Sequence, residues 1–238
     1  TLYIMNTNKS IARNAGLIYL IVVISGIFSL MYVPTQLIDF NNAATTYQNI
    51  QSHELLFRLG ILGNVICYLA FMILPFALYK LLKNIHPNMA KGMVILVLIG
   101  IPVAFVNLQH KFAVLSMLNN EYLFADIPLN QLQQQLLISL QNFNNGINVL
   151  SVFWGLWLFP FGWLVFKSGF LPKLLGILLM LGCMSYLIDF SAWLLLPEYS
   201  SSGISTFVML PASIGEIGIC LWLLIVGVSK SKVTDQHA

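Results

Sequence analysis

The segment INVLSVFWGLWLFPFGWLVF, residues 147–166, contains no charged side chain and is followed directly by Lys167. An apolar run of about 20 residues is long enough, as a helix rising 1.5 Å per residue, to cross the hydrocarbon core of a bilayer. Inside that core every backbone polar group must be paired within its own segment, which favours a helix. The segment therefore predicts a transmembrane helix.

The rest of the chain has the same character. Of its 238 residues, 58% are hydrophobic and only 8% are charged, and the mean hydropathy is +0.84. A soluble domain carries about 25% charged residues. Further apolar runs of spanning length lie at residues 12–32, 57–82, 92–115, 171–190 and 206–226. We therefore predict an all-α, polytopic membrane helix bundle with six transmembrane helices.

Charges in the connections separate by sign if the six spans alternate in direction. One side holds the basic residues Lys9, Arg13, Lys80, Lys83, Lys91, Lys167, Lys173, Lys230 and Lys232. The other side holds Asp39, Glu54, Glu121, Asp126 and Glu198, with Arg58 and Lys111 near span ends. Because cytoplasmic loops are enriched in Lys and Arg, both termini are predicted to be cytoplasmic. Residues 12–228 then form the membrane domain between cytoplasmic tails at 1–11 and 229–238.

Composition argues against several classes of protein. The formal charge of +3 comes without a dense basic run, so nucleic acid is not expected as a partner. Cys67, Cys183 and Cys220 lie inside apolar runs without metal-ligand spacing, and we interpret them as small core residues.

The two longer connections lie on the acidic side. Turn signals at Pro34 and Asn41–Asn42 are expected to end the first span before a helical stretch. In the other connection, residues 129–140, four leucines fall on one helical face. That segment is expected to lie on the membrane surface or to extend the fourth span outward, as a connector or as a lid over a pocket. The leucines of this face are Leu129, Leu132, Leu136 and Leu140.

Ionisable residues inside spans are costly, so each raises a functional hypothesis. Glu216 lies near the middle of the last span, and its helical neighbours Ala212, Ser213, Gly215 and Cys220 form a small-residue face suited to helix packing. Glu216 is therefore expected to point into the bundle. It is a candidate proton-linked site, because burial disfavours the charged form of a carboxyl group.

Other polar residues fall in the same outer half of the membrane, and together they predict an outward-facing polar pocket. The candidate ligand-binding residues are Arg58, Asn64, Asn107, His110, Lys111, Asn148, Asp189 and Glu216. The alternative is a buried network that fixes helix register, in which Arg58 or Lys111 neutralises Asp189 or Glu216. Glu54 and Arg58, four residues apart, are expected to form an ion pair.

Several stretches resemble a known family. They are IARNAGLIYLIVVISGIF (11–28), NIQSHELLFRLGILGNVICYL (49–69), FKSGFLPKLLGILLMLGCMSYLIDF (166–190) and GEIGICLWLLIVGV (215–228). They resemble the bacterial membrane family named domain of unknown function 4386, and the Ser-Gly-x-Leu-Pro-x-x-Leu-Gly stretch at 168–176 is the most specific part. The resemblance implies a multi-pass protein of the bacterial cytoplasmic membrane and no particular chemistry. Locally, Gly169 suits a tight turn with positive φ, and Pro172 suits the start of the next helix.

Three functional hypotheses follow. The first is a protein that binds or transports a small ligand or solute through the polar pocket, with the lipid bilayer and a small ligand or lipid as partners. The second is a metal-dependent intramembrane enzyme, and the third is a non-catalytic membrane scaffold. No metal-binding motif occurs, although His53, Glu54, His110, Asp189 and Glu216 offer suitable ligands. Catalytic residues, cofactors and protein partners are not indicated by the sequence.

Overall fold

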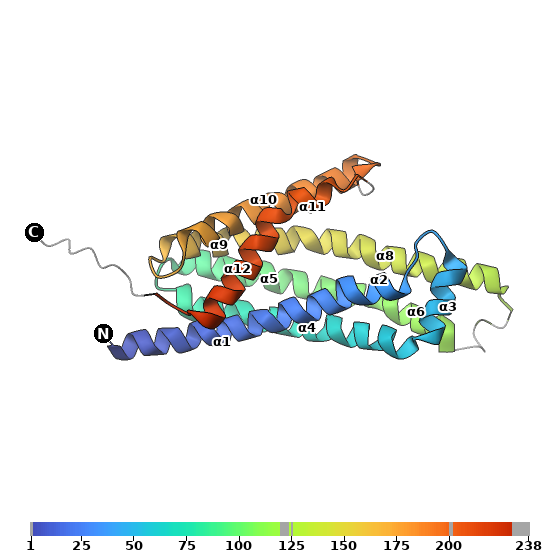
Figure 1. Ribbon diagram of the computed structural model, residues 1–238, viewed down its shortest axis with the longest axis horizontal. Helices are drawn as coiled ribbons and strands as arrows, with labels where there is room; N and C mark the ends of the chain where they lie inside the picture. Colours follow the sequence, from blue (N-terminus) through green and yellow to red (C-terminus); the bar gives the residue numbers. More distant parts are fainter. Residues whose placement is uncertain (1, 120–123, 125, 200–201, 230–238) are drawn as a thin grey trace, which may run out of the picture. The chain divides into compact units, whose positions relative to one another are not determined.

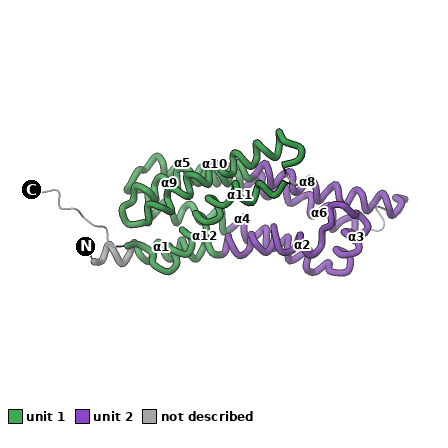
Figure 2. Tube along the Cα trace, turned by 45° about the horizontal axis from the view of Figure 1, so that its top comes forward, with its two compact units in different colours: residues 1–20, 70–100, 151–238 green, residues 21–69, 101–150 purple. Residues whose placement is uncertain are grey.

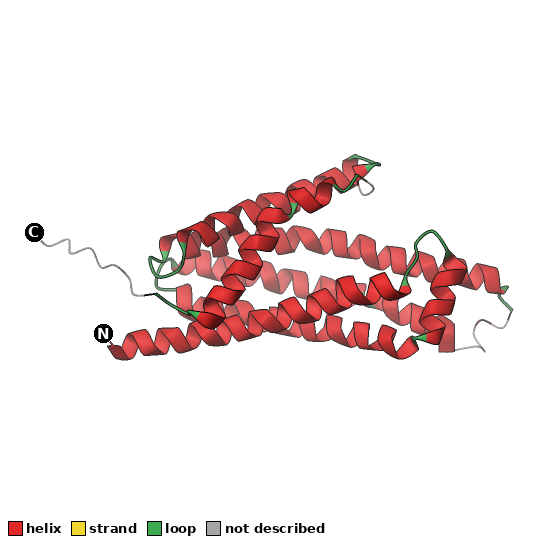
Figure 3. Cartoon of the chain, viewed as in Figure 1, coloured by secondary structure: helices red, strands yellow, loops and turns green. Residues whose placement is uncertain are grey.

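The computed structural model describes residues 2–119, 124, 126–199 and 202–229. Within these ranges the chain is almost entirely helical and no strand occurs (Figure 3). Its elements in chain order (Figure 1) are α1 (Leu2–Gly26), the π-helix η1 (Ile27–Tyr32), α2 (Val33–Leu37), α3 (Ala43–Ser52), α4 (Glu54–Leu82), α5 (Pro87–Asn107), α6 (Gln109–Asn119), α8 (Leu129–Leu156), α9 (Leu158–Lys167), α10 (Lys173–Leu195), α11 (Ile204–Val208) and α12 (Leu210–Ile225). The all-α prediction is confirmed.

Five helical stretches are long and apolar enough to cross a membrane, namely Asn8–Leu37, Glu54–Leu82, Pro87–Asn119, Leu129–Lys167 and Lys173–Leu195. The sixth apolar helix, α12, has 16 residues, or about 24 Å at the α-helical rise. The short helix α11 precedes it, with only Met209 between them. These helices make the chain a multi-pass membrane protein.

The turn expected at Pro34 is wrong, because the first helical stretch continues to Leu37. The reason lies in the π-helix. The N–H of Val33 donates to the carbonyl of Phe28, five residues back, so the carbonyl of Ser29 would next face the nitrogen of Pro34. Proline has no N–H to donate. The Ser29 carbonyl is instead 3.5 Å from Nζ of Lys111, so the helix passes through Pro34 without an unpaired buried carbonyl.

The chain forms two compact units, coloured separately in Figure 2. Unit 1 comprises residues 1–20, 70–100 and 151–238, and unit 2 comprises residues 21–69 and 101–150.

Close helix packing through glycine characterises unit 1, where α9 and α12 both pack on α10 (Figure 1). A Cβ added at Gly162 of α9 would come within 2.6 Å of the Gly176 carbonyl of α10. A Cβ at Gly182 of α10 would come within 2.9 Å of Cα of Ala212 in α12. Small residues allow membrane helices to approach this closely. On the predicted small-residue face of the last span, Ala212, Gly215 and Cys220 are buried, whereas Ser213 is exposed.

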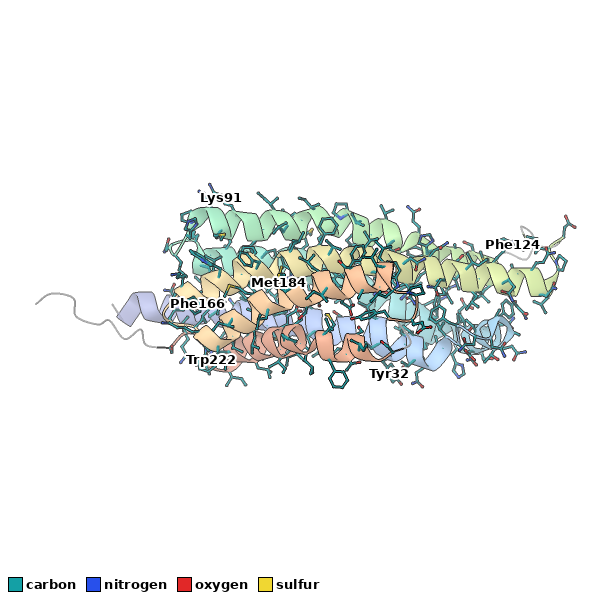
Figure 4. All side chains as sticks on the ribbon, turned by 90° about the horizontal axis from the view of Figure 1, so that it is seen from above. Tyr32, Lys91, Phe124, Phe166, Met184 and Trp222 are labelled. Atoms are coloured by element: carbon teal, nitrogen blue, oxygen red, sulfur yellow. The ribbon has the colours of Figure 1, made fainter. Side chains whose placement is uncertain are left out.

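One end of unit 1 gathers several basic residues. The Arg13 guanidinium donates to the carbonyl of Ile225 over 3.2 Å, and the N–H of Ser229 donates to that of Phe170 over 3.1 Å. The rings of His86 and Trp163 lie 5.3 Å apart. The start of α1, the α4–α5 connection, the α9–α10 turn and the end of α12 therefore lie together. Figure 4 labels Lys91, Phe166 and Trp222 at this end.

The α9–α10 turn has the predicted form. Gly169 has φ 71°, and Pro172 directly precedes α10.

The connections that carry the basic residues between Lys9 and Lys173 lie at one end of unit 1. This is the arrangement expected if an even number of spans separates them. Glu121, Lys230 and Lys232, which the charge analysis also used, lie outside the described residues.

The core of unit 2 is built from α2, α3, α4, α6 and α8. Leu136 and Leu140 are fully buried in it, and Leu132 is 8% exposed, whereas Leu129 is exposed. The predicted leucine face is therefore confirmed for three of its four positions. Helix α8 runs unbroken from Leu129 to Leu156, so this segment extends the fourth span and is not a separate surface helix.

The contact between Gly162 and Gly176 gives a stability prediction. Gly162→Ala is expected to lower the free energy of unfolding by about 1–3 kcal/mol, because its Cβ would meet backbone atoms that cannot move aside easily. Gly92→Ala, in α5, is the matched control, since no atom lies within 4 Å of the added Cβ. The control should be neutral or stabilise the protein by up to about 1 kcal/mol through helix propensity. Thermal unfolding in detergent measures both, and equal effects of the two substitutions would contradict the packing described.

Candidate functional site

The eight candidate ligand-binding residues divide between the two units. Unit 1 holds Asp189 and Glu216, and unit 2 holds Arg58, Asn64, Asn107, His110, Lys111 and Asn148. A single pocket shared by all eight stays a prediction. Within each unit the structure forms a separate polar cluster.

The cluster in unit 2 is centred on Lys111 of α6, which is 3% exposed. Its Nζ donates to Oδ1 of Asn64 over 2.8 Å and lies 3.5 Å from the carbonyl oxygen of Ser29. The same nitrogen lies 4.2 Å from the centre of the Phe143 ring. The Asn64 amide also donates to the hydroxyl of Ser29 over 3.0 Å. Three segments of the chain thus supply neutral groups to one buried amine.

A helix break positions the lysine. Helix α5 ends at Asn107 and α6 begins at Gln109, with Leu108 between them. The Asn107 amide donates to the carbonyl of Phe143 over 2.9 Å, which ties this break to α8 beside the ring that Lys111 approaches. Gly146 makes room for the amide, since any side chain there would overlap Asn107. The candidates Asn107 and Lys111 are both buried. The candidate His110 is half-buried.

The charge of Lys111 has no carboxylate partner among residues 2–119, 124, 126–199 and 202–229. In those ranges Arg58 forms an ion pair with Glu54, and the distance from its Nη2 to Oε1 of Glu54 is 2.5 Å. The Asn119 amide also donates a hydrogen bond to Oε1 of Glu54 over 3.0 Å. This confirms the predicted four-residue pair. Arg58 is exposed and is paired with Glu54. Asn148 is half-buried on α8.

The cluster in unit 1 is centred on Glu216 of α12. The Tyr19 hydroxyl of α1 donates to Oε2 of Glu216 over 3.0 Å, and the Tyr186 hydroxyl of α10 donates to Oε1 over 3.1 Å. Glu216 therefore turns toward neighbouring helices, as its small-residue face predicted. Neither the sequence periodicity nor a motif identified Tyr19. The available signal was a phenol in the middle of an apolar run, which needs a partner when buried.

Packing fixes both phenols. Tyr19 is 1% exposed, and its ring lies 6.1 Å from that of Trp157. Cβ of Tyr186 approaches Gly155 so closely that a Cβ added there would lie 2.6 Å away. The two hydroxyls are thus held in place before any ligand arrives.

Asp189 lies one helical turn beyond Tyr186 on α10. Its Oδ1 accepts a hydrogen bond from the hydroxyl of Tyr199 over 2.7 Å. Tyr199 lies in the connection after α10 and is 7% exposed. Burial, together with the Asp189 carboxylate, raises the pKa of Tyr199 above its usual value.

Among the described residues, no group of three or more His, Cys, Asp and Glu side chains lies close enough together to hold a metal ion. This includes the candidates His53, Glu54, His110, Asp189 and Glu216. The three cysteines are buried. Cys220 lies 3.8 Å from the carbonyl of Gly16, in keeping with a small core residue.

Comparison with known proteins agrees with the resemblance seen in the sequence. An uncharacterized protein of Archaeoglobus fulgidus is 34% identical over 84 residues, which cover 35% of this chain and 48% of that protein. The chain therefore spans about half the length of the curated relative it matches. No solved structure matches the chain significantly. The model of the family described as Domain of unknown function (DUF4386) matches residues 14–227, and the chain belongs to that family.

Proposed function

We propose that this membrane protein binds a small anionic solute at the Lys111 cluster, as a binding protein or transporter. The observation that carries the proposal is the buried amine of Lys111, whose contacts within the described part of the chain are all to neutral groups. Removing an unpaired charge from water costs several kcal/mol even after the protein relaxes. A ligand that brings a negative charge to Lys111 would offset that cost.

The contacts of Lys111 include one ordinary hydrogen bond. Among the described residues Asn64 alone lies at such a distance, 2.8 Å. The carbonyl of Ser29 at 3.5 Å is at the limit, and the Phe143 ring offers a weaker cation–π contact. A carboxylate or phosphate oxygen would form a charge-assisted hydrogen bond, which is about twice as strong as a neutral one. The solute class we propose is therefore a small carboxylate or phosphate.

We further propose that the protein lies in the bacterial cytoplasmic membrane with both termini in the cytoplasm, so that Asp189, Glu216 and the Lys111 cluster lie in the outer half. The tails at 1–11 and 229–238 would then be cytoplasmic. The charge asymmetry of the connections supports this orientation.

Replacement of Asn64 by Asp tests the anion site. Asn64→Asp has the same shape and places a carboxylate beside Nζ of Lys111, while the Ser29 hydroxyl can turn to donate to it. We expect phosphate or acetate, compared with chloride at equal ionic strength, to raise the unfolding temperature of the original protein saturably. At 100 times Kd the stabilisation should be about 2.7 kcal/mol. Asn64→Asp should fold at least as stably and lose this response.

Lys111→Met should also lose the response, whereas Lys91→Met, which changes an exposed lysine, should retain it. The proposal fails if neither anion stabilises the original protein more than chloride does, or if the response survives in Asn64→Asp and Lys111→Met.

Cysteine labelling tests the orientation. Asn41 and Asn84 are both exposed asparagines in turns, and the three native cysteines are buried. On intact cells a membrane-impermeant thiol reagent should label Asn41→Cys and not Asn84→Cys, and opening the cells should expose both. The reverse pattern would overturn the proposed orientation and leave the fold unaffected.

A further inference from the structure

We propose that Glu216 binds and releases a proton inside the membrane, and that Tyr199, Asp189 and Tyr186 form its path of entry. This inference concerns unit 1 alone and does not depend on the anion proposed for Lys111. The sequence indicated only the carboxyl group of Glu216. The inference adds the ion that it binds, a proton, and the route by which the proton arrives.

The geometry consists of two hydrogen bonds between a tyrosine and a carboxylate, and each involves one residue of α10. The Tyr199 hydroxyl bonds to Asp189 over 2.7 Å at the end of the helix, and the Tyr186 hydroxyl bonds to Glu216 over 3.1 Å. Asp189 and Tyr186 are three residues apart and therefore lie on the same face of the helix. Polar groups thus lead from the connection after α10 to the carboxyl group on α12.

The surroundings of Glu216 accept both of its protonation states. The titratable groups that face it are Tyr19 from α1, Tyr186 from α10 with Asp189 one turn beyond, and Cys220 on its own helix. Within the described ranges no Lys, Arg or His forms an ion pair with it. An ionised carboxylate accepts from both phenols, whereas a protonated carboxyl donates to one phenol oxygen after that hydroxyl has turned. A proton can therefore arrive and leave without movement of the helices.

Aromatic side chains lie beyond Tyr19. On the far side of Tyr19 the fully buried Trp157 stacks on Phe161, with ring centres 5.1 Å apart, and meets the ring of Phe71 at 5.3 Å. None of these three side chains is ionisable. A proton that reaches Glu216 from Asp189 thus meets no further ionisable side chain in this aromatic cluster.

The transfer balances in a single relay. Protonated Asp189 gives its proton to the phenol oxygen of Tyr186, directly or through water. The O–H bond of Tyr186 breaks as its own proton forms a new O–H bond at Oε1 of Glu216. Tyr186 is left neutral, and Asp189 takes a new proton from the medium near Tyr199. The net change is one proton from the medium bound to the Glu216 carboxylate.

Infrared difference spectroscopy between alkaline and acidic pH tests the site without any ligand. The original protein should show the carbonyl stretch of a newly protonated carboxyl group. Glu216→Gln should abolish this band, and Glu198→Gln, at an exposed glutamate, should leave it unchanged. Tyr19→Phe should move it to higher frequency, because the carboxyl group loses a hydrogen-bond partner. If Glu216→Gln does not fold, the shifts in Tyr19→Phe and Tyr186→Phe identify the group in its place.

A rapid drop in pH tests the path. Asp189→Asn should slow the appearance of the band about tenfold or more, equivalent to about 1.4 kcal/mol in the barrier, with the final amplitude unchanged. Loss of the band itself in Asp189→Asn would assign the proton to Asp189 and overturn the proposal. An unchanged rate would remove Asp189 from the route, and a band that persists in Glu216→Gln would remove Glu216 from the site.

Discussion

The structure depends on the absence of water from the bilayer core, which obliges each polar group to find a partner inside the protein. Pro34 shows how far this constraint reaches. Its missing N–H leaves the Ser29 carbonyl without its expected π-helical donor, and the side chain of Lys111 approaches that oxygen from another helix. The lysine in turn holds Asn64 and brings α6 against the first helical stretch and α4. The carbonyl that Pro34 leaves without a backbone donor thus lies in a cluster made from residues far apart in the sequence.

The same constraint explains what could be predicted from the sequence. Apolar length predicts spans, because lipid forces each run to be helical whatever its neighbours are. Local features could also be predicted, because helical spacing alone defines them. Examples are the pair of Glu54 with Arg58 and the buried face of Leu132, Leu136 and Leu140. The positive φ of Gly169 followed from the tight turn in which it lies.

Helical periodicity does not predict contacts between residues of different helices. No local sequence pattern indicates the hydrogen bond from Tyr19 to Glu216, 197 residues apart, or the one from Asn107 to the carbonyl of Phe143. The end of the first span was predicted wrongly for a related reason. Pro34 would end the helix only if the Ser29 carbonyl, which it cannot pair, had no other donor. The amine of Lys111 approaches that carbonyl from 82 residues away in the sequence. Long-range compensation of this kind has no signature in a single sequence.

The two clusters share a property that separates them from the ion pair at the chain's surface. Glu54 and Arg58 neutralise each other, and an exposed pair of this type contributes little to stability. Lys111 and Glu216 instead contact amide, carbonyl, phenol and aromatic groups among the described residues, and such groups interact with a charge without cancelling it. A group held in this way can gain or lose a proton or a counter-ion while its neighbours keep their positions. A register-fixing network gains nothing from that freedom, and for this reason we interpret both clusters as functional.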